Sequence, residues 1–169
     1  MALLPIIKAP DPRLKIVCDP VEQVDDDLRL LMDNMLETMY AAPGVGLAAP
    51  QIGVAKRIIV MDVARHDEAP MPLRIVNPEI IELSGSVVSR EEGCLSFPGQ
   101  FTEVERPKTL RFRYWDENNQ VKELEAAGLS AICIQHEMDH LDGILLTDRI
   151  SAIKRSMIIR KMKKLKKNP

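Results

Sequence analysis

Two histidines stand four residues apart in the stretch Gln135-His136-Glu137-Met138-Asp139-His140. Four residues of an α-helix make a little over one turn, so both imidazoles lie on one face, about 6 Å apart along the helix axis. Two imidazoles placed in this way can bind one metal ion, and Glu137 can then act as a general base toward a metal-bound water. The alternative is a surface helix that happens to carry two of the chain's three histidines. The helical flanks and the shared face favour a metal site.

A third protein ligand is needed, because catalytic sites of this kind use three and leave one position open. No Glu and no His follows His140, and Leu146 stands where a third histidine of one common pattern would be. Asp142 follows His140 too closely to turn back comfortably toward the metal, and Asp148 has no motif around it. We therefore expect the third ligand upstream of the helix, among the cysteines.

The three cysteines differ in how well they can serve as that ligand. Cys133 lies on the face of His136 but about 10.5 Å along the axis from His140, so we expect it to line the adjacent pocket. Cys18 lies between extended segments and is expected to be a small buried hydrophobe. Cys94 lies in a glycine-containing loop between strands, where its thiolate can face the helix, and it is the favoured ligand. An odd, small number of cysteines gives no disulfide framework and indicates a reducing compartment.

The pattern along the chain predicts an α+β fold. Short, mostly antiparallel strands would pack around a central metal-binding helix, with an N-terminal and a C-terminal helix beside them. Asp25 can cap the first helix, whose methionine stripe we expect in the core. The expected helices are 25–41, 129–141 and about 150–166, and the expected strands are 57–63, 73–76, 80–83, 87–89, 101–104, 110–115 and 121–126.

The connections in the middle of the chain are also predicted from their residues. Asn77-Pro78 is expected to be a turn, and Ser84-Gly85 is expected to join strands 80–83 and 87–89 as a hairpin. Segment 90–99 breaks the strand pattern and is expected to be a loop. These residues would therefore form one hairpin followed by a long loop.

Length and composition fit a single globular domain over residues 1–169, with 46% hydrophobic and 28% charged residues. No apolar run reaches roughly 18 residues, so no membrane span and no membrane partner are expected. The first residues lack the basic start and the long apolar stretch of a signal peptide.

The charge is unevenly distributed. From Arg149 onward the chain has nine Lys or Arg and no Asp or Glu. Residues 1–148 therefore hold 14 of the 23 basic residues and all 25 acidic ones, which gives this part a net charge of −11. A basic tail on an acidic body indicates a polyanionic partner. The tail is also amphipathic, and we expect it to pack on the body through Ile153 and Met157.

Two further motifs precede the histidine helix, namely Gly44-Val45-Gly46-Leu47-Ala48-Ala49-Pro50-Gln51 and Glu92-Gly93-Cys94-Leu95-Ser96. The small residues of the first let a backbone approach something closely. With these three motifs in this order, the chain resembles the peptide deformylase family, in particular its type 1 bacterial and organellar group. The resemblance covers essentially the whole chain, including the opening Asp11 to Leu14.

The resemblance implies a hydrolase that removes the formyl group from N-formylmethionine at the start of new chains and releases formate. Cys94, His136 and His140 would bind the metal. Glu137 would take a proton from the attacking water and pass it to the leaving amine. The Gln51 side chain and the Leu95 backbone N–H would stabilise the developing oxyanion. The metal is expected to be Fe2+, with Zn2+, Ni2+ and Co2+ as alternatives.

The resemblance also implies how the substrate binds and where the protein acts. Val45 and Gly46 would offer backbone hydrogen bonds to an extended peptide. The methionine pocket would be formed by Leu129, Ile132 and Cys133 together with Val45, and Glu92 would contact the loop backbone or His136. Because formylated chains emerge at the ribosome, the basic helix is expected to touch ribosomal RNA. A monomer in the bacterial cytoplasm, or in an organelle, is expected.

Two other functions fit parts of the sequence. The first is a zinc peptidase of the His-Glu-x-x-His type that cuts internal peptide bonds, against which the missing downstream ligand argues. The second is a non-catalytic peptide-binding module with a structural metal. Such a metal would have four protein ligands and would need no base such as Glu137.

Overall fold

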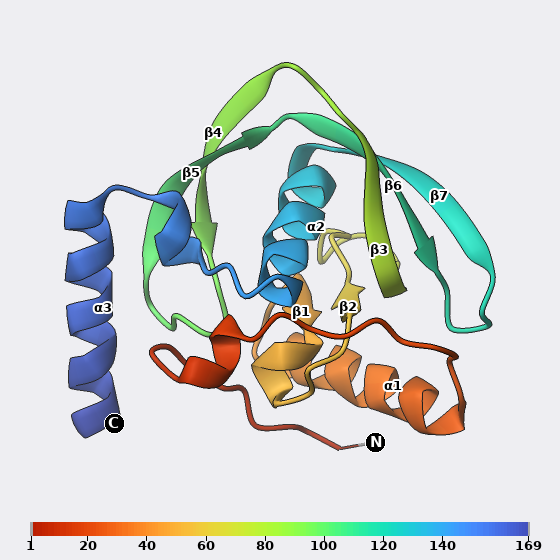
Figure 1. The fold of residues 1–169 in the computed structure, drawn as a ribbon, viewed down its shortest axis with the longest axis horizontal. Coiled ribbons are helices and arrows are strands. Elements are labelled where there is room, and N and C mark those ends of the chain that lie inside the picture. Colours follow the sequence, from red (N-terminus) through yellow and green to blue (C-terminus); the bar gives the residue numbers. More distant parts are fainter. Residues whose placement is uncertain (1, 169) are drawn as a thin grey trace.

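The computed structural model describes residues 2–168 and has the predicted α+β architecture. Figure 1 shows α2 in the middle of the molecule, with β4 and β5 on one side and β3, β6 and β7 on the other. A five-stranded antiparallel sheet has the order β1-β2-β3-β6-β7, and β4 pairs with β5 as a second, two-stranded sheet. The described helices are α1 (Asp26–Ala41), α2 (Gly128–Leu141) and α3 (Ala152–Lys167), and the strands are β1 (Gly46–Ala48), β2 (Ile58–Met61), β3 (Leu73–Leu83), β4 (Val87–Gly93), β5 (Phe101–Pro107), β6 (Thr109–Trp115) and β7 (Val121–Ala127).

Helix α1 forms where the sequence predicts it. The Asp25 side chain accepts a hydrogen bond from the Leu28 backbone N–H, which satisfies one of the free donors of the first turn. Met32, Met35 and Met39 are fully buried and pack with residues of β1 and β2 in one core cluster. The methionine stripe is therefore core, as expected.

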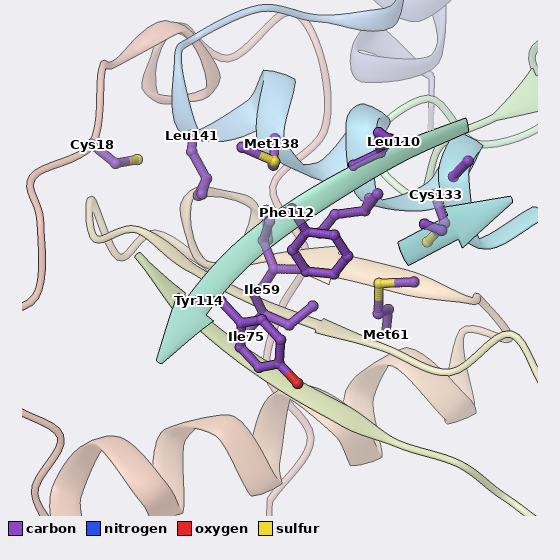
Figure 2. Close-up of a cluster of buried hydrophobic side chains, with 14 residues drawn as sticks. Cys18, Ile59, Met61, Ile75, Leu110, Phe112, Tyr114, Cys133, Met138 and Leu141 are labelled. Carbon is purple, nitrogen blue, oxygen red and sulfur yellow. The ribbon is translucent and has the colours of Figure 1, made fainter. Parts of the chain in front are cut away.

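Helix α2 is buried on nearly all sides and packs against β1, β2 and β7. A second core cluster joins this helix to the five-stranded sheet, and Figure 2 shows Phe112 and Ile59 of the sheet beneath Met138 and Leu141 of the helix. Gly143 ends the segment with a φ of 71°, and a Cβ there would collide with the Lys15 carbonyl oxygen. The buried helix therefore holds its side chains in fixed positions.

The prediction of a turn at Asn77-Pro78 is wrong, because β3 continues through these two residues as one eleven-residue strand. The strand absorbs the proline at a β-bulge, where the register with β6 shifts between Val76 and Glu79. Asn77 takes a φ of 50°, and its side chain hydrogen-bonds both the N–H and the carbonyl of Val21. These bonds to a distant segment stabilise a conformation that local propensity does not favour.

The predicted hairpin of strands 80–83 and 87–89 is also wrong. Strand β3 pairs with β6, whereas β4 pairs with β5, so the chain changes sheets at Ser84-Gly85, as Figure 1 shows. The predicted loop over 90–99 begins too early, since β4 runs to Gly93. The last residues of β4 look like a polar loop in the sequence because they include the charged Glu92. In the structure Glu92 is buried, and it is paired with a buried arginine from β5.

Helix α3 starts at the N-cap Ser151 and lies at one edge of the molecule in Figure 1. It packs through Ile158 and Met162, which are buried. Ile153 and Met157 are 77% and 54% exposed, so the expectation that they pack on the body is wrong. The helix is rotated so that its more C-terminal apolar residues meet the core. Within residues 2–168, no helix combines the length and the apolar character needed to cross a membrane.

Candidate metal centre

Cys94, His136 and His140 come together at the centre of the fold. Their possible ligand atoms all lie within 4.8 Å of one another. Both histidines project from α2, and Cys94 begins the turn that follows β4, where its carbonyl accepts a hydrogen bond from the Phe97 N–H at 2.9 Å. The two imidazole ring centres are 5.2 Å apart. One thiol and two imidazoles therefore converge from two separate parts of the chain.

His136 is oriented by a carboxylate behind it. Its Nδ1 lies 3.1 Å from Glu92 Oε1, and because a carboxylate can only accept, Nδ1 carries the proton. Burial opposes the ionisation of Glu92, but hydrogen bonds from His136 and Arg106 hold its pKa below the ordinary value. Burial opposes the protonation of His136, but Cys94 and Glu92 raise its pKa well above the ordinary value, so a cation would bind at Nε2 by replacing a proton there.

His140 is almost completely buried. Its Nε2 lies 3.3 Å from Cys94 Sγ, and its Nδ1 has no hydrogen-bond partner within the described part of the chain. Burial, together with the positive charge of His136 and Arg106, lowers the pKa of His140 well below its ordinary value. A neutral imidazole facing a thiol and a second imidazole is a donor set that suits a divalent transition metal.

Glu137 lies next to this donor set and is almost completely buried. Burial raises the pKa of its carboxyl group to about 7, although the positive charge of His136 and Arg106 opposes the shift. Its Oε1 has no hydrogen-bond partner among residues 2–168. A Cβ at Gly46 would come within 2.6 Å of Glu137 Oε2, so only glycine leaves room for the carboxyl group. Glu137 can therefore gain and lose a proton near neutral pH.

Gln51 and Leu95 lie beside Cys94. Gln51 is fixed at both ends, because its Oε1 accepts from the Ala48 N–H at 2.9 Å and its Nε2 donates to Ser96 Oγ at 3.0 Å. The same Nε2 lies 3.6 Å from Cys94 Sγ. Leu95 packs on Gly44, where a Cβ would come within 2.7 Å of its side chain. The two upstream motifs therefore meet at the thiol.

A groove of about 760 Å³ opens onto these residues. Strand β1 is the edge strand of its sheet, and the segment that contains it lines the groove with Val45 and Gly46. Leu129, Ile132 and Cys133 of α2 line it as well. Glu92 also reaches the groove, but both of its oxygens are bonded to Arg106 and one also to His136. All the predicted substrate-binding residues therefore surround one groove.

Arg106 belongs to the site although no sequence motif indicated it. This side chain of β5 is buried, and it donates two hydrogen bonds to Glu92, at 2.7 and 3.0 Å. A third bond of 2.9 Å reaches Asp139, which also accepts two from Arg149. The alternation of buried and exposed residues along β5 could have indicated its burial, because Arg106 lies on the same face as the buried Thr102 and Val104.

A thiol, two imidazoles and a buried carboxyl group at the end of an open groove define the chain as a metal-dependent hydrolase. The profile of the polypeptide deformylase family matches residues 3–156. The chain therefore belongs to the peptide deformylase family.

Individual relatives agree with this assignment. The peptide deformylase of Phenylobacterium zucineum is 56% identical, and the aligned region covers 97% of each chain. That of Mesorhizobium japonicum is 51% identical over 99% of this chain and 96% of the relative. The crystal structure of the Ehrlichia chaffeensis peptide deformylase in complex with actinonin superposes with a TM-score of 0.95, at 42% identity, and covers 99% of this chain and all of its own.

Proposed function

We propose that Cys94, His136 and His140 hold one divalent metal ion and that Glu137 is the catalytic base. The reaction is that of the family, in which the formyl group is removed from N-formylmethionine at the start of new proteins and formate is released. The observation that carries the residue assignment is the convergence of the three ligand atoms within 4.8 Å, next to a buried Glu137 without a hydrogen-bond partner for Oε1 among residues 2–168.

The chemistry divides between the metal and the chain. When bound, the metal supplies Lewis acidity toward the formyl oxygen and lowers the pKa of water. Glu137 accepts a proton from the water that adds to the formyl carbon and returns it to the amine that leaves. The Gln51 amide and the Leu95 N–H stabilise the negative charge that develops on the formyl oxygen. The fixed orientation of Gln51 supports this role, because it costs no reorganisation during the reaction.

The peptide binds in the groove as an added strand. Val45 and Gly46, at the open edge of the sheet, offer backbone hydrogen bonds to it. The methionine side chain enters the apolar pocket of Leu129, Ile132 and Cys133, next to the metal ligands. Glu92 lines the same groove and orients His136. Residues 1–169 act as one catalytic domain that ends in the basic helix α3.

The native metal is Fe2+, with Zn2+, Ni2+ and Co2+ as possible substitutes at a site of one sulfur and two nitrogens. An iron–thiolate centre reacts with oxygen, and oxidation of the cysteine would release the metal. Protein purified without oxygen is therefore expected to hold more iron and more activity than the same cell paste purified in air. The cell paste is divided in two, and the iron content and the formate release of the two purified proteins are compared. Equal iron and equal activity would contradict the iron assignment.

The basic residues of α3 bring the protein, as a monomer, to ribosomal RNA in the bacterial cytoplasm or in an organelle. Support comes from the nine basic residues from Arg149 onward and from the exposure of the helix surface. Ribosome co-sedimentation is expected to fall steeply as salt increases. Removal of residues after Arg160 takes away five of the nine basic residues and is expected to weaken it strongly, and replacement of the same five lysines by glutamine, which keeps the buried Met162, is expected to do the same while formate release from a short peptide stays. Unchanged co-sedimentation of the glutamine variant would contradict this role.

A further inference from the structure

Ser96 carries a hydroxyl group that lies completely inside the protein, in the turn after β4 and two residues beyond Cys94. Its Oγ donates to the carbonyl of Ile7 at 2.7 Å and lies 3.0 Å from Gln51 Nε2. A serine hydroxyl has one hydrogen, so a hydroxyl that donates to Ile7 can only accept from Gln51. The acceptor role of Ser96 toward Gln51 therefore depends on the N-terminal segment.

These contacts determine which end of the Gln51 amide faces the metal ligands. The Ala48 N–H can only donate, so it requires the amide oxygen, and its bond to Oε1 is 2.9 Å long. Ser96 Oγ, whose hydrogen is already used, requires the NH2 group. A reversed amide would place two donors together at Ala48 and two acceptors together at Ser96. Nε2 therefore donates one hydrogen to Ser96, and its second hydrogen is left for a group on the side of Cys94, whose Sγ is 3.6 Å away.

The N-terminal segment is itself bonded to both of these loops. The Ile7 N–H donates to the Gln51 carbonyl at 2.7 Å. The Ala9 N–H donates to the Ser96 carbonyl at 2.9 Å. The Ile7 side chain packs against a third core cluster, which contains the buried Phe97. The carbonyl that the Ser96 hydroxyl needs is therefore fixed in place, although 89 residues separate Ile7 from Ser96.

We propose that Ser96 is a positioning residue that, held by the Ile7 carbonyl, keeps the Gln51 N–H directed at the formyl oxygen during the reaction. The inference rests on the proposed function and adds Ser96 and the N-terminal segment to the groups that control its rate. Without the hydroxyl, the Gln51 NH2 group loses its oxygen acceptor, and the amide can rotate. A donor stabilises an oxyanion best when it is held in place before the reaction. Because the peptide binds along Val45 and Gly46, Ser96 should affect the chemical step and not substrate binding.

A double-mutant cycle tests this role with formyl-Met-Ala-Ser as the substrate. Ser96→Ala is expected to lower kcat about ten- to a hundredfold and to leave KM within about twofold of the wild-type value. Gln51→Ala removes the donor itself and is expected to lower kcat about a hundred- to a thousandfold. Ser96→Ala added to Gln51→Ala is expected to lower kcat by less than about twofold more, because the group that Ser96 positions is gone. Each kcat is expressed per bound metal ion, so incompletely loaded protein does not distort it.

Thr38→Val is the matched control. The buried Thr38 hydroxyl accepts from the Leu4 N–H and so holds the same N-terminal segment, but it donates to the Asn34 carbonyl and not to Gln51. This variant is expected to keep the wild-type kcat. An unchanged kcat in Ser96→Ala, an equal loss in both backgrounds, a change in KM alone, loss of the metal, or the same loss of kcat in Thr38→Val would overturn the positioning role. Absence of formate release from the wild type would instead overturn the proposed function itself.

Discussion

Replacement of Glu137 by glutamine is expected to lower kcat/KM for a formylated peptide about a thousandfold while the metal stays bound. Glutamine has nearly the shape of glutamate, so the close contact with Gly46 and the burial of the side chain are preserved. It cannot accept the proton of the attacking water. The metal ligands Cys94, His136 and His140 are untouched, so the metal content should remain that of the wild type.

Formate release and metal content, measured on the same preparation, check this expectation. The matched control is Glu105→Gln, which makes the same change at an exposed position of β5 outside the groove and should leave both quantities unchanged. Substantial activity in Glu137→Gln would mean that another group accepts the proton. Loss of the metal would instead assign Glu137 a role in holding the site together.

Replacement of Arg106 by methionine is expected to cost about 3–5 kcal/mol of unfolding free energy. Arg106 lies between two carboxylates, Glu92 and Asp139, and it is itself buried. Removal of its charge leaves Glu92 buried without its bidentate partner. Glu92 also orients His136, so weaker metal retention should accompany the loss of stability.

Urea unfolding of the apo and metal-bound proteins measures both effects of this substitution. Arg113→Met is a suitable control, because Arg113 pairs with Glu123 on the solvent-exposed face of β6 and β7. Loss of this exposed pair should change the free energy of unfolding little. Arg106→Lys keeps the charge but loses the bidentate geometry, so it should fall between wild type and Arg106→Met. A stability of Arg106→Met equal to that of the Arg113 variant would contradict the role of the buried network.

The sequence predicts well the elements whose side chains follow a local period. Helix α1 and the buried helix α2 lie where their patterns place them, and the face shared by His136 and His140 follows from helical geometry alone. Cys94 could also be found from the sequence, because the absence of a downstream ligand left few residues able to complete the site. Three sequence motifs were thus enough to locate the centre of the fold.

Long-range pairing explains what the sequence did not predict. The β3 strand passes through Pro78 because Asn77 bonds to Val21, which is 56 residues away. The end of β4 resembles a loop because Glu92 is charged, and its burial is stabilised by Arg106 from the neighbouring strand β5 and by His136. Buried charged residues obscure the apolar periodicity on which strand prediction depends. Their partners become visible only after the two strands are paired.

The substrate of the site is tested most directly by formate release. Wild-type protein purified without oxygen is incubated with formyl-Met-Ala-Ser, with its N-acetylated counterpart and with a longer peptide that carries only internal amide bonds. Formate from the first peptide, with the other two left intact, is the result expected of a deformylase. Cleavage of the internal bonds without formate would indicate a zinc peptidase. No turnover of any of the three would indicate a peptide-binding module, and either result would contradict the function assigned to Glu137 and the three metal ligands.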